Sequence, residues 1–193
     1  MASFVNVIEY ITIASTGNVT DFGDLTLSIG EHGSCASTTR GITQMGGTTS
    51  GGDQNVISYV TISSTGNATD FGDLTVARNE NESGGASNAT RGFFAGGHDS
   101  GKTNVIDYIT IASAGNATDF GDLYDSLHKV ASMASPTRGI TAGGTKSSGA
   151  NYTIAYITIA STGNTTDFGD LITESSNLTG ESTACSASHG GIS

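Results

Sequence analysis

The sequence contains no tryptophan, a single proline and two cysteines among its 193 residues. It has no run of 18 or more apolar residues, so it predicts no membrane-spanning helix. Seven Lys and Arg stand against 18 Asp and Glu, and the resulting net charge of −11 argues against direct binding to nucleic acid. No window shows the 3.6-residue period of an amphipathic helix. These absences leave a small all-β protein as the simplest reading.

The two cysteines, Cys35 and Cys185, do not belong to a Cys-x-x-Cys pair. Spacing alone cannot show the geometry that a disulfide needs, and free thiols are favoured. The sequence before Asn6 has no basic segment followed by an apolar core, so we expect no cleavable signal peptide.

Glycine is abundant, with 28 residues, and Gly, Ser, Thr and Asn fill the stretches between short apolar runs. This composition is typical of many short strands joined by turns.

One block of sequence occurs four times. Asn6–Ile13 returns as Asn55–Ile62, as Asn104–Ile111 and, with changes, as Tyr152–Ile159, and each copy runs on through Gly-Asn-x-Thr-Asp-Phe-Gly-Asp-Leu. The repeated aromatic residues recur at intervals of 49, 49 and 48 residues: Tyr10, Tyr59, Tyr108 and Tyr156, and Phe22, Phe71, Phe120 and Phe168. A fixed period of this size indicates a repeat architecture.

A single unit reads as about four short strands. Arg91–Gly97 is a short apolar run that ends in two glycines, and Asn104–Ala112 is rich in Val, Ile and Tyr. A hairpin turn separates this strand from a third one at Thr118–Leu123, and the variable segment Tyr124–Ser135 supplies a fourth strand or an edge loop. Four antiparallel strands per repeat predict a propeller blade, with a parallel β-helix as the alternative.

The order of these features resembles a kelch repeat. Glycine pairs follow the first strand at Gly46-Gly47, Gly96-Gly97 and Gly143-Gly144, the repeated Tyr lies in the second strand, and the repeated Phe stands where kelch repeats carry Trp. The resemblance implies an all-β, kelch-like propeller with four four-stranded blades in a single domain, 1–193. The expected repeats span approximately 5–47, 48–97, 98–144 and 145–193.

The ends of the sequence suggest how such a ring closes. The first unit starts at its second strand, and Ser188–Ser193 resembles a truncated copy of the missing first strand, with His189 in the place of the repeated Arg. We therefore expect the C-terminal strand to latch onto the first blade and to cover exposed sheet edges. Two arrangements stay open: a four-bladed ring from one chain, or an eight-bladed ring from two chains that exchange latches.

The repeated Asp-Phe-Gly, first seen at Asp21–Gly23, lacks the other motifs of a protein kinase. We interpret its Asp as a side chain that accepts hydrogen bonds from turn amides, in preference to a metal ligand. The Asn-x-Thr tripeptides read as hairpin turns. The four histidines do not share metal-ligand spacing, and we expect no metal, no cofactor and no catalytic residue.

Three of the seven basic residues occupy the same place in successive units: Arg40, Arg91 and Arg138. In kelch repeats this arginine bonds backbone carbonyls, and that structural role is the favoured one here. The alternative is a ring of guanidinium groups that binds an anion or a carboxylated sugar.

The nearly identical Asn-Val-Ile-x-Tyr-Ile-Thr-Ile and Thr-Asp-Phe-Gly-Asp-Leu segments resemble those of kelch-like proteins of marine bacteriophages, which are commonly virion structural proteins. The resemblance implies a non-enzymatic capsid- or tail-associated protein, located in the virion after assembly in the host cytoplasm. Its expected partners are other virion proteins or copies of itself, with no nucleic acid and no membrane. The alternative is a carbohydrate-binding adhesin with surface glycans as partners.

Overall fold

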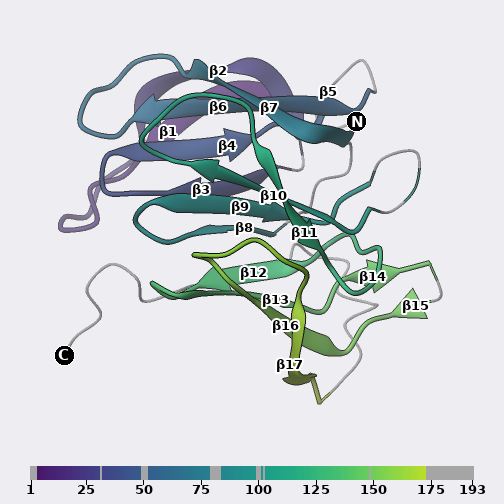
Figure 1. Cartoon of the computed structure of the whole chain (residues 1–193). Helices are drawn as coiled ribbons and strands as arrows, with labels where there is room; N and C mark the ends of the chain where they lie inside the picture. Colours follow the sequence, from purple (N-terminus) through teal and green to yellow (C-terminus); the bar gives the residue numbers. More distant parts are fainter. Residues whose placement is uncertain are drawn as a thin grey trace.

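The structure is a computed structural model that describes residues 4–30, 32–48, 52–78, 84–98, 101, 103–147 and 149–172. In these ranges the chain is all-β and has no helix (Figure 1). Three antiparallel sheets have four strands each, a further sheet has three, and a two-stranded ribbon completes the set. The all-β prediction is confirmed.

We number the sheets by their order along the chain. The first sheet has the order β1(Val5–Tyr10), β2(Thr20–Gly30), β5(Gly47–Thr48). The second is β3(Gly33–Ala36), β4(Arg40–Gln44), β6(Gln54–Thr61), β7(Thr69–Arg78). The third is β8(Gly84–Ser87), β9(Arg91–Ala95), β10(Val105–Thr110), β11(Thr118–Asp122). The fourth is β12(Ala131–Ala134), β13(Arg138–Ala142), β16(Thr153–Thr158), β17(Thr166–Asp170), and the ribbon is β14(Thr145–Lys146) with β15(Gly149–Ala150).

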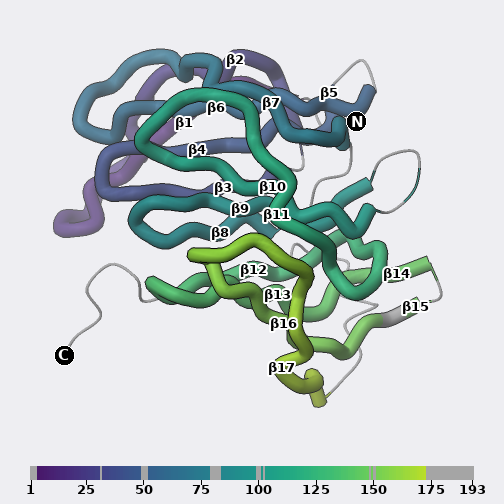
Figure 2. Tube along the Cα trace, viewed as in Figure 1, coloured from purple at the N-terminus to yellow at the C-terminus, as the bar shows by residue number. Residues whose placement is uncertain are grey.

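The sheets pack face to face in chain order, with the first and the fourth at opposite ends of the row (Figures 1 and 2). Strand β8 lies next to both β3 and β12, so the first strands of the second, third and fourth sheets are neighbours. This arrangement buries both faces of an interior strand. In β10, for example, Ile106 and Ile109 point to opposite faces and are 0% and 2% exposed.

The main core consists of two apolar clusters, each between two consecutive sheets. The first joins the second and third sheets: Cys35, Ile42, Ile57, Phe71, Leu74, Phe94, Ile109, Ile111 and Ala117. The second cluster joins the third and fourth sheets and includes Phe93, Phe120, Leu123, Ile157 and Ile159. The third sheet thus supplies side chains to the core on both of its faces.

The structure changes the predicted assignment of the variable segment. Its strand, β12, pairs with β13 and not with the preceding β11, so it opens the next sheet instead of closing the previous one. Strands β3 and β8 behave in the same way. Among the described residues the first sheet has no such opening pair, because β1 and β2 correspond to the last two strands of the other sheets. The predicted latch, Ser188–Ser193, lies outside the described residues.

The last two strands of each sheet contain a bulge at the repeated Phe-Gly-Asp. The pairing of β10 with β11 shifts register between Ile106 and Asp107, opposite Gly121. Gly121 has a φ of +140°, a conformation that residues with a Cβ rarely adopt. The bulge therefore explains why a glycine follows the Phe in every repeat.

Candidate functional site

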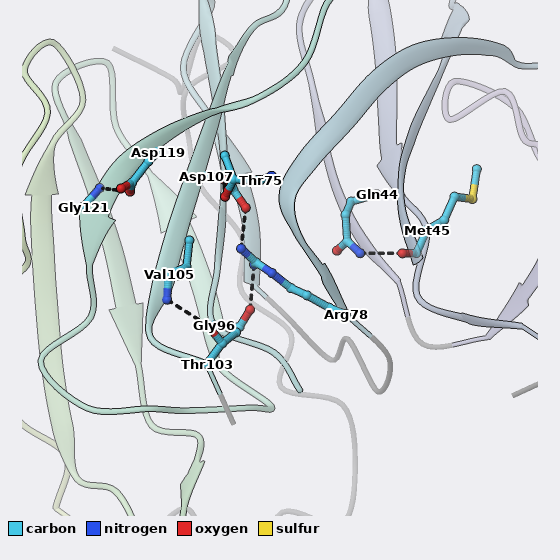
Figure 3. A network of polar contacts seen from close by, with 10 residues as sticks. All are labelled: Gln44, Met45, Thr75, Arg78, Gly96, Thr103, Val105, Asp107, Asp119 and Gly121. Atoms are coloured by element: carbon cyan, nitrogen blue, oxygen red, sulfur yellow. Dashed lines mark hydrogen bonds and ion pairs between the residues drawn. The ribbon is translucent and has the colours of Figure 1, made fainter. Parts of the chain in front are cut away.

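The first Asp of each Asp-Phe-Gly-Asp stabilises the bulge of its own strand. Asp119 Oδ1 accepts a hydrogen bond of 2.9 Å from the backbone amide of Gly121, as drawn in Figure 3. The other three repeats make the same bond from Gly23 to Asp21, from Gly72 to Asp70 and from Gly169 to Asp167. The predicted hydrogen bonds from amides to these carboxylates are present, but the donors belong to a strand bulge and not to a turn.

The same strand also receives the next sheet. The Gly-Asn turn that precedes β11 donates backbone hydrogen bonds from Gly115 to Phe71 O and from Ala117 to Asp73 O, both 2.7 Å. In the opposite direction, the amide of Asp73 donates to Asn116 Oδ1 at 3.1 Å. We call this group of three bonds the turn-to-strand contact.

The turn-to-strand contact occurs between all consecutive sheets. The Gly66–Ala68 turn makes it on Phe22 and Asp24, and the Gly163–Thr165 turn makes it on Phe120 and Asp122. The repeated Asn side chains, predicted only as turn residues, thus bond from one sheet to the next. The sequence does not predict this role, because a repeated motif does not show whether its contacts lie within one unit or between two units.

Glycine lets the two backbones come this close. A Cβ placed on Gly72 would lie 2.5 Å from the carbonyl group of Gly115, and one on Gly121 would lie 2.5 Å from that of Gly163. Any larger residue at these positions would push two sheets apart.

The repeated arginines also connect neighbouring sheets. Arg40 donates from its guanidinium to Ile111 O at 2.8 Å, and Arg91 donates to Ile159 O at 2.7 Å. The guanidinium of each lies over the Tyr of its own sheet, 4.5 Å from the ring centre of Tyr59 for Arg40 and 4.8 Å from that of Tyr108 for Arg91. The favoured structural role, bonding to backbone carbonyls, thus describes these two arginines. Arg138 lies 4.6 Å above Tyr156 and is exposed.

The repeated Tyr and Phe form one edge-to-face pair per sheet, with ring centres 5.7–6.2 Å apart: Tyr10–Phe22, Tyr59–Phe71, Tyr108–Phe120 and Tyr156–Phe168. The geometry of the ring pair is the same in each sheet, but the burial of its members is not. Phe71 and Phe120 are 2% and 3% exposed, whereas Phe168 is 54% exposed. The four Tyr differ in burial as well: Tyr10 is 41% exposed, and the other three, each beneath an arginine, are half-buried.

A buried ion pair interrupts the repeat between the second and third sheets. Arg78 bonds Asp107 through Nη2 and donates from Nη1 to Gly96 O at 2.7 Å, and both side chains are 0% exposed (Figure 3). The hydroxyl of Thr75 donates a further bond to Asp107. Burial raises the pKa of the Asp107 carboxyl, while Arg78 and Thr75 act in the opposite direction.

Arg78 and Asp107 were not among the residues predicted to matter, although an alignment of the four repeats shows that both positions are unusual. Arg78 stands where the other units have Ile29 and Leu127, and Asp107 stands where they have Glu9, Ser58 and Ala155. A cation and an anion thus replace two other residues at positions that face each other across one pair of sheets. Paired departures from a repeat are evidence of contact between units.

A hollow of about 430 Å³ lies between the first and second sheets. Its lining includes Ile8 and Leu25 from the first sheet and Cys35, Ile42 and Tyr59 from the second. The second, third and fourth sheets each begin with two strands, β3–β4, β8–β9 and β12–β13, that have no counterpart in the described part of the first sheet. The side chain of Cys35 packs in the cluster between the second and third sheets, where it is buried as a free thiol and desolvation raises its pKa to about 12.

The described histidines do not form a metal site. The rings of His98 and His128 lie 6.2 Å apart, and no cluster of three or more His, Cys, Asp or Glu suited to a metal ion occurs in the described part of the chain. His189 and Cys185 lie outside the described residues. Within the described ranges the chain also has no helix long and apolar enough to cross a membrane.

No model of a known protein family matches the chain, and a search of curated proteins finds no match to it.

Proposed function

We propose that this chain is a non-enzymatic structural protein that acts by docking to other proteins, as a kelch-like β-propeller in a virus particle. The observation that carries the proposal is that the repeated polar side chains make hydrogen bonds within a sheet or to the next sheet. The repeated Asp holds a bulge, the repeated Asn bonds the next sheet, and Arg40 and Arg91 bond carbonyls of the next sheet. Side chains that are engaged in this way serve the scaffold and not a substrate.

The propeller part of the proposal is supported by the arrangement of the sheets. The sheets are antiparallel, and in the second, third and fourth sheets the strands are ordered as they follow in the chain. The first strands of these sheets, β3, β8 and β12, lie next to one another. Propeller blades pack in this manner around a central axis. The virion part is supported by the resemblance of the repeated segments to those of kelch-like phage proteins. A rigid module with a net charge of −11 suits display on a surface.

The experiment is quantitative mass spectrometry of purified particles from a virus that encodes this chain. The proposal predicts a fixed number of copies per particle that survives washing in high salt. A glycan array with the purified chain tests the alternative. Absence from particles together with saturable binding of a defined sugar would replace the structural proposal with the adhesin.

A further inference from the structure

The two ends of the row of sheets carry complementary halves of the turn-to-strand contact. At one end, the first sheet presents a Gly-Asn turn at Gly17–Val19 with the same sequence pattern as the three turns that dock inside the chain. At the other end, the fourth sheet presents the strand Phe168–Asp170, which matches the three strands that receive such a turn.

The strand at the fourth sheet is uncovered within the described part of the chain. Phe168 is 54% exposed, against 2% for Phe71 and 3% for Phe120. No described atom lies within 4 Å of a Cβ built on Gly169, whereas a Cβ on Gly72 or Gly121 meets backbone at 2.5 Å. The bulge of this strand is nevertheless formed in full, because Gly169 donates to Asp167 Oδ1 at 3.0 Å. The receiving surface is therefore preformed and vacant among the described residues.

The first sheet, too, has its matching face uncovered by the residues that the structure describes. Ile11 and Ile13 are 60% and 95% exposed. Their equivalents in the fourth sheet, Ile157 and Ile159, are 3% and 2% exposed beneath the third sheet. Val19, next to the Gly-Asn turn, is 54% exposed. An exposed row of large apolar side chains of this kind marks an interaction surface.

We propose that the fourth sheet of one copy of this chain binds the first sheet of a second copy through the turn-to-strand contact. In that interface Gly17 and Val19 of the second copy donate to the carbonyls of Phe168 and Asp170. The amide of Asp170 donates to the side chain of the second copy's Asn18. These are the bonds that Gly115, Ala117 and Asn116 make inside the chain.

The arginine series supports the same pairing. Arg40 and Arg91 each donate to the carbonyl of the Ile that ends the central strand motif in the following sheet, Ile111 and Ile159. Arg138 is exposed on the fourth sheet, and the equivalent carbonyl belongs to Ile13 on the first sheet. A second copy would bring that carbonyl to Arg138 and would cover the 95% exposed side chain of Ile13.

A second copy is the occupant because the two surfaces lie at opposite ends of one chain (Figures 1 and 2). The contact joins different surfaces of the two copies, so it is heterologous. Such contacts grow until the rotation between copies closes a ring, or continue as a filament. The inference does not depend on the virion assignment, because it uses only contacts within the chain.

The test is sedimentation velocity on the full chain over concentrations from about 1 to 500 μM, a range in which Kd values from micromolar to millimolar are visible. The wild type should form dimers or larger species whose fraction rises with concentration. Phe168→Asp should weaken association by about tenfold or more, because it places a charge in an apolar contact. Asn18→Ala and Arg138→Gln should weaken association to a smaller extent.

Mixing separates this head-to-tail contact from any symmetric one. A variant with Phe168→Asp retains an intact first sheet, and a variant with both Asn18→Ala and Gly17→Val retains an intact fourth sheet. Each should be monomeric alone, and an equimolar mixture should form a dimer that does not grow further. The matched control is Phe71→Asp, which should lower the melting temperature sharply, whereas Phe168→Asp should leave that of the monomer unchanged.

Three results would overturn the proposal. The first is a wild type that stays monomeric over the whole range. The second is association that Phe168→Asp leaves unchanged. The third is a monomer that Phe168→Asp destabilises as strongly as Phe71→Asp does, because the fourth sheet would then be closed against the chain's own first sheet.

Discussion

The contact between the second and third sheets and the contact between the third and fourth share the same outer bonds but have different centres. Both have a turn-to-strand contact and an arginine that reaches a carbonyl of the next sheet. At the first of these contacts Arg78 and Asp107 form a buried ion pair, and the equivalent positions at the second are occupied by Leu127 and Ala155. The repeated residues hold any two sheets together, and the residues that depart from the repeat distinguish one contact from another.

The largest expected effect tests the shared part of the comparison. Phe120→Ala should lower the free energy of unfolding by about 3–5 kcal/mol, because it removes a buried aromatic side chain between the third and fourth sheets. Phe168→Ala is the matched control. It should cost less than about 1 kcal/mol in dilute protein, since Phe168 is more than half exposed. Urea titration of both variants measures the difference, and equal losses would contradict the assigned positions.

The second effect tests the part that differs. Asp107→Ala should cost about 3–5 kcal/mol, because it leaves the buried charge of Arg78 without its counter-charge. The double variant Arg78→Leu with Asp107→Ala copies Leu127 and Ala155 from the next contact. Its stability should return to within about 1 kcal/mol of the wild type or exceed it. A double variant no more stable than Asp107→Ala would show that the two positions are not equivalent to Leu127 and Ala155.

A smaller effect comes from the close approach of two glycines. Gly121→Ala and Gly169→Ala share the same backbone strain, with φ of +140° and +146°, which costs about 1–3 kcal/mol. Only the Cβ at position 121 also meets the backbone of Gly163. Thermal unfolding in dilute protein should therefore show that the free energy of unfolding of Gly121→Ala is about 1–3 kcal/mol lower than that of Gly169→Ala. The reverse order would place the contact between sheets elsewhere.

The smallest effect concerns the amide side chain in the turn. Asn116→Ala removes the acceptor for the Asp73 amide and should cost about 1 kcal/mol. Asn18→Ala, in the turn of the first sheet, should be neutral for the isolated chain. Differential scanning calorimetry of the pair measures this, and a loss at Asn18 as large as that at Asn116 would indicate that Asn18 is engaged within one copy.

Much of this architecture follows from local patterns. The strands around Ile106 and Phe120 and the bond from a nearby amide to Asp119 were predictable from alternation and side-chain chemistry. The carbonyl bonds of Arg40 and Arg91 were expected only from the resemblance to kelch repeats. The assignment of strand β12 was not predictable in the same way. A periodic sequence shows the length of its repeat but not where a sheet starts, so only the pairing of β12 with β13 could decide it.

Contacts between units were the hardest to predict. The Asn116 side chain was assigned to its own turn, and only the folded chain shows that it accepts a bond from Asp73 in the preceding sheet. The half-burial of Tyr108 also depends on packing, since the guanidinium of Arg91 lies over one face of its ring. Packing of one sheet on the next decides both features, and a repeat that is read as a single unit does not contain that information.

Hydrogen exchange of four glycine amides reports on the turn-to-strand contact itself, because a glycine amide is one of its three donors between every two consecutive sheets. Gly66, Gly115 and Gly163 donate to the preceding sheet, so their exchange should be slowed towards the rate set by global unfolding. Gly17 occupies the same place in a turn at the open end, and it should exchange rapidly in dilute protein and more slowly as the concentration rises. Exchange of Gly115 and Gly163 as fast as that of Gly17 in dilute protein would show that the repeated motif does not hold the sheets together.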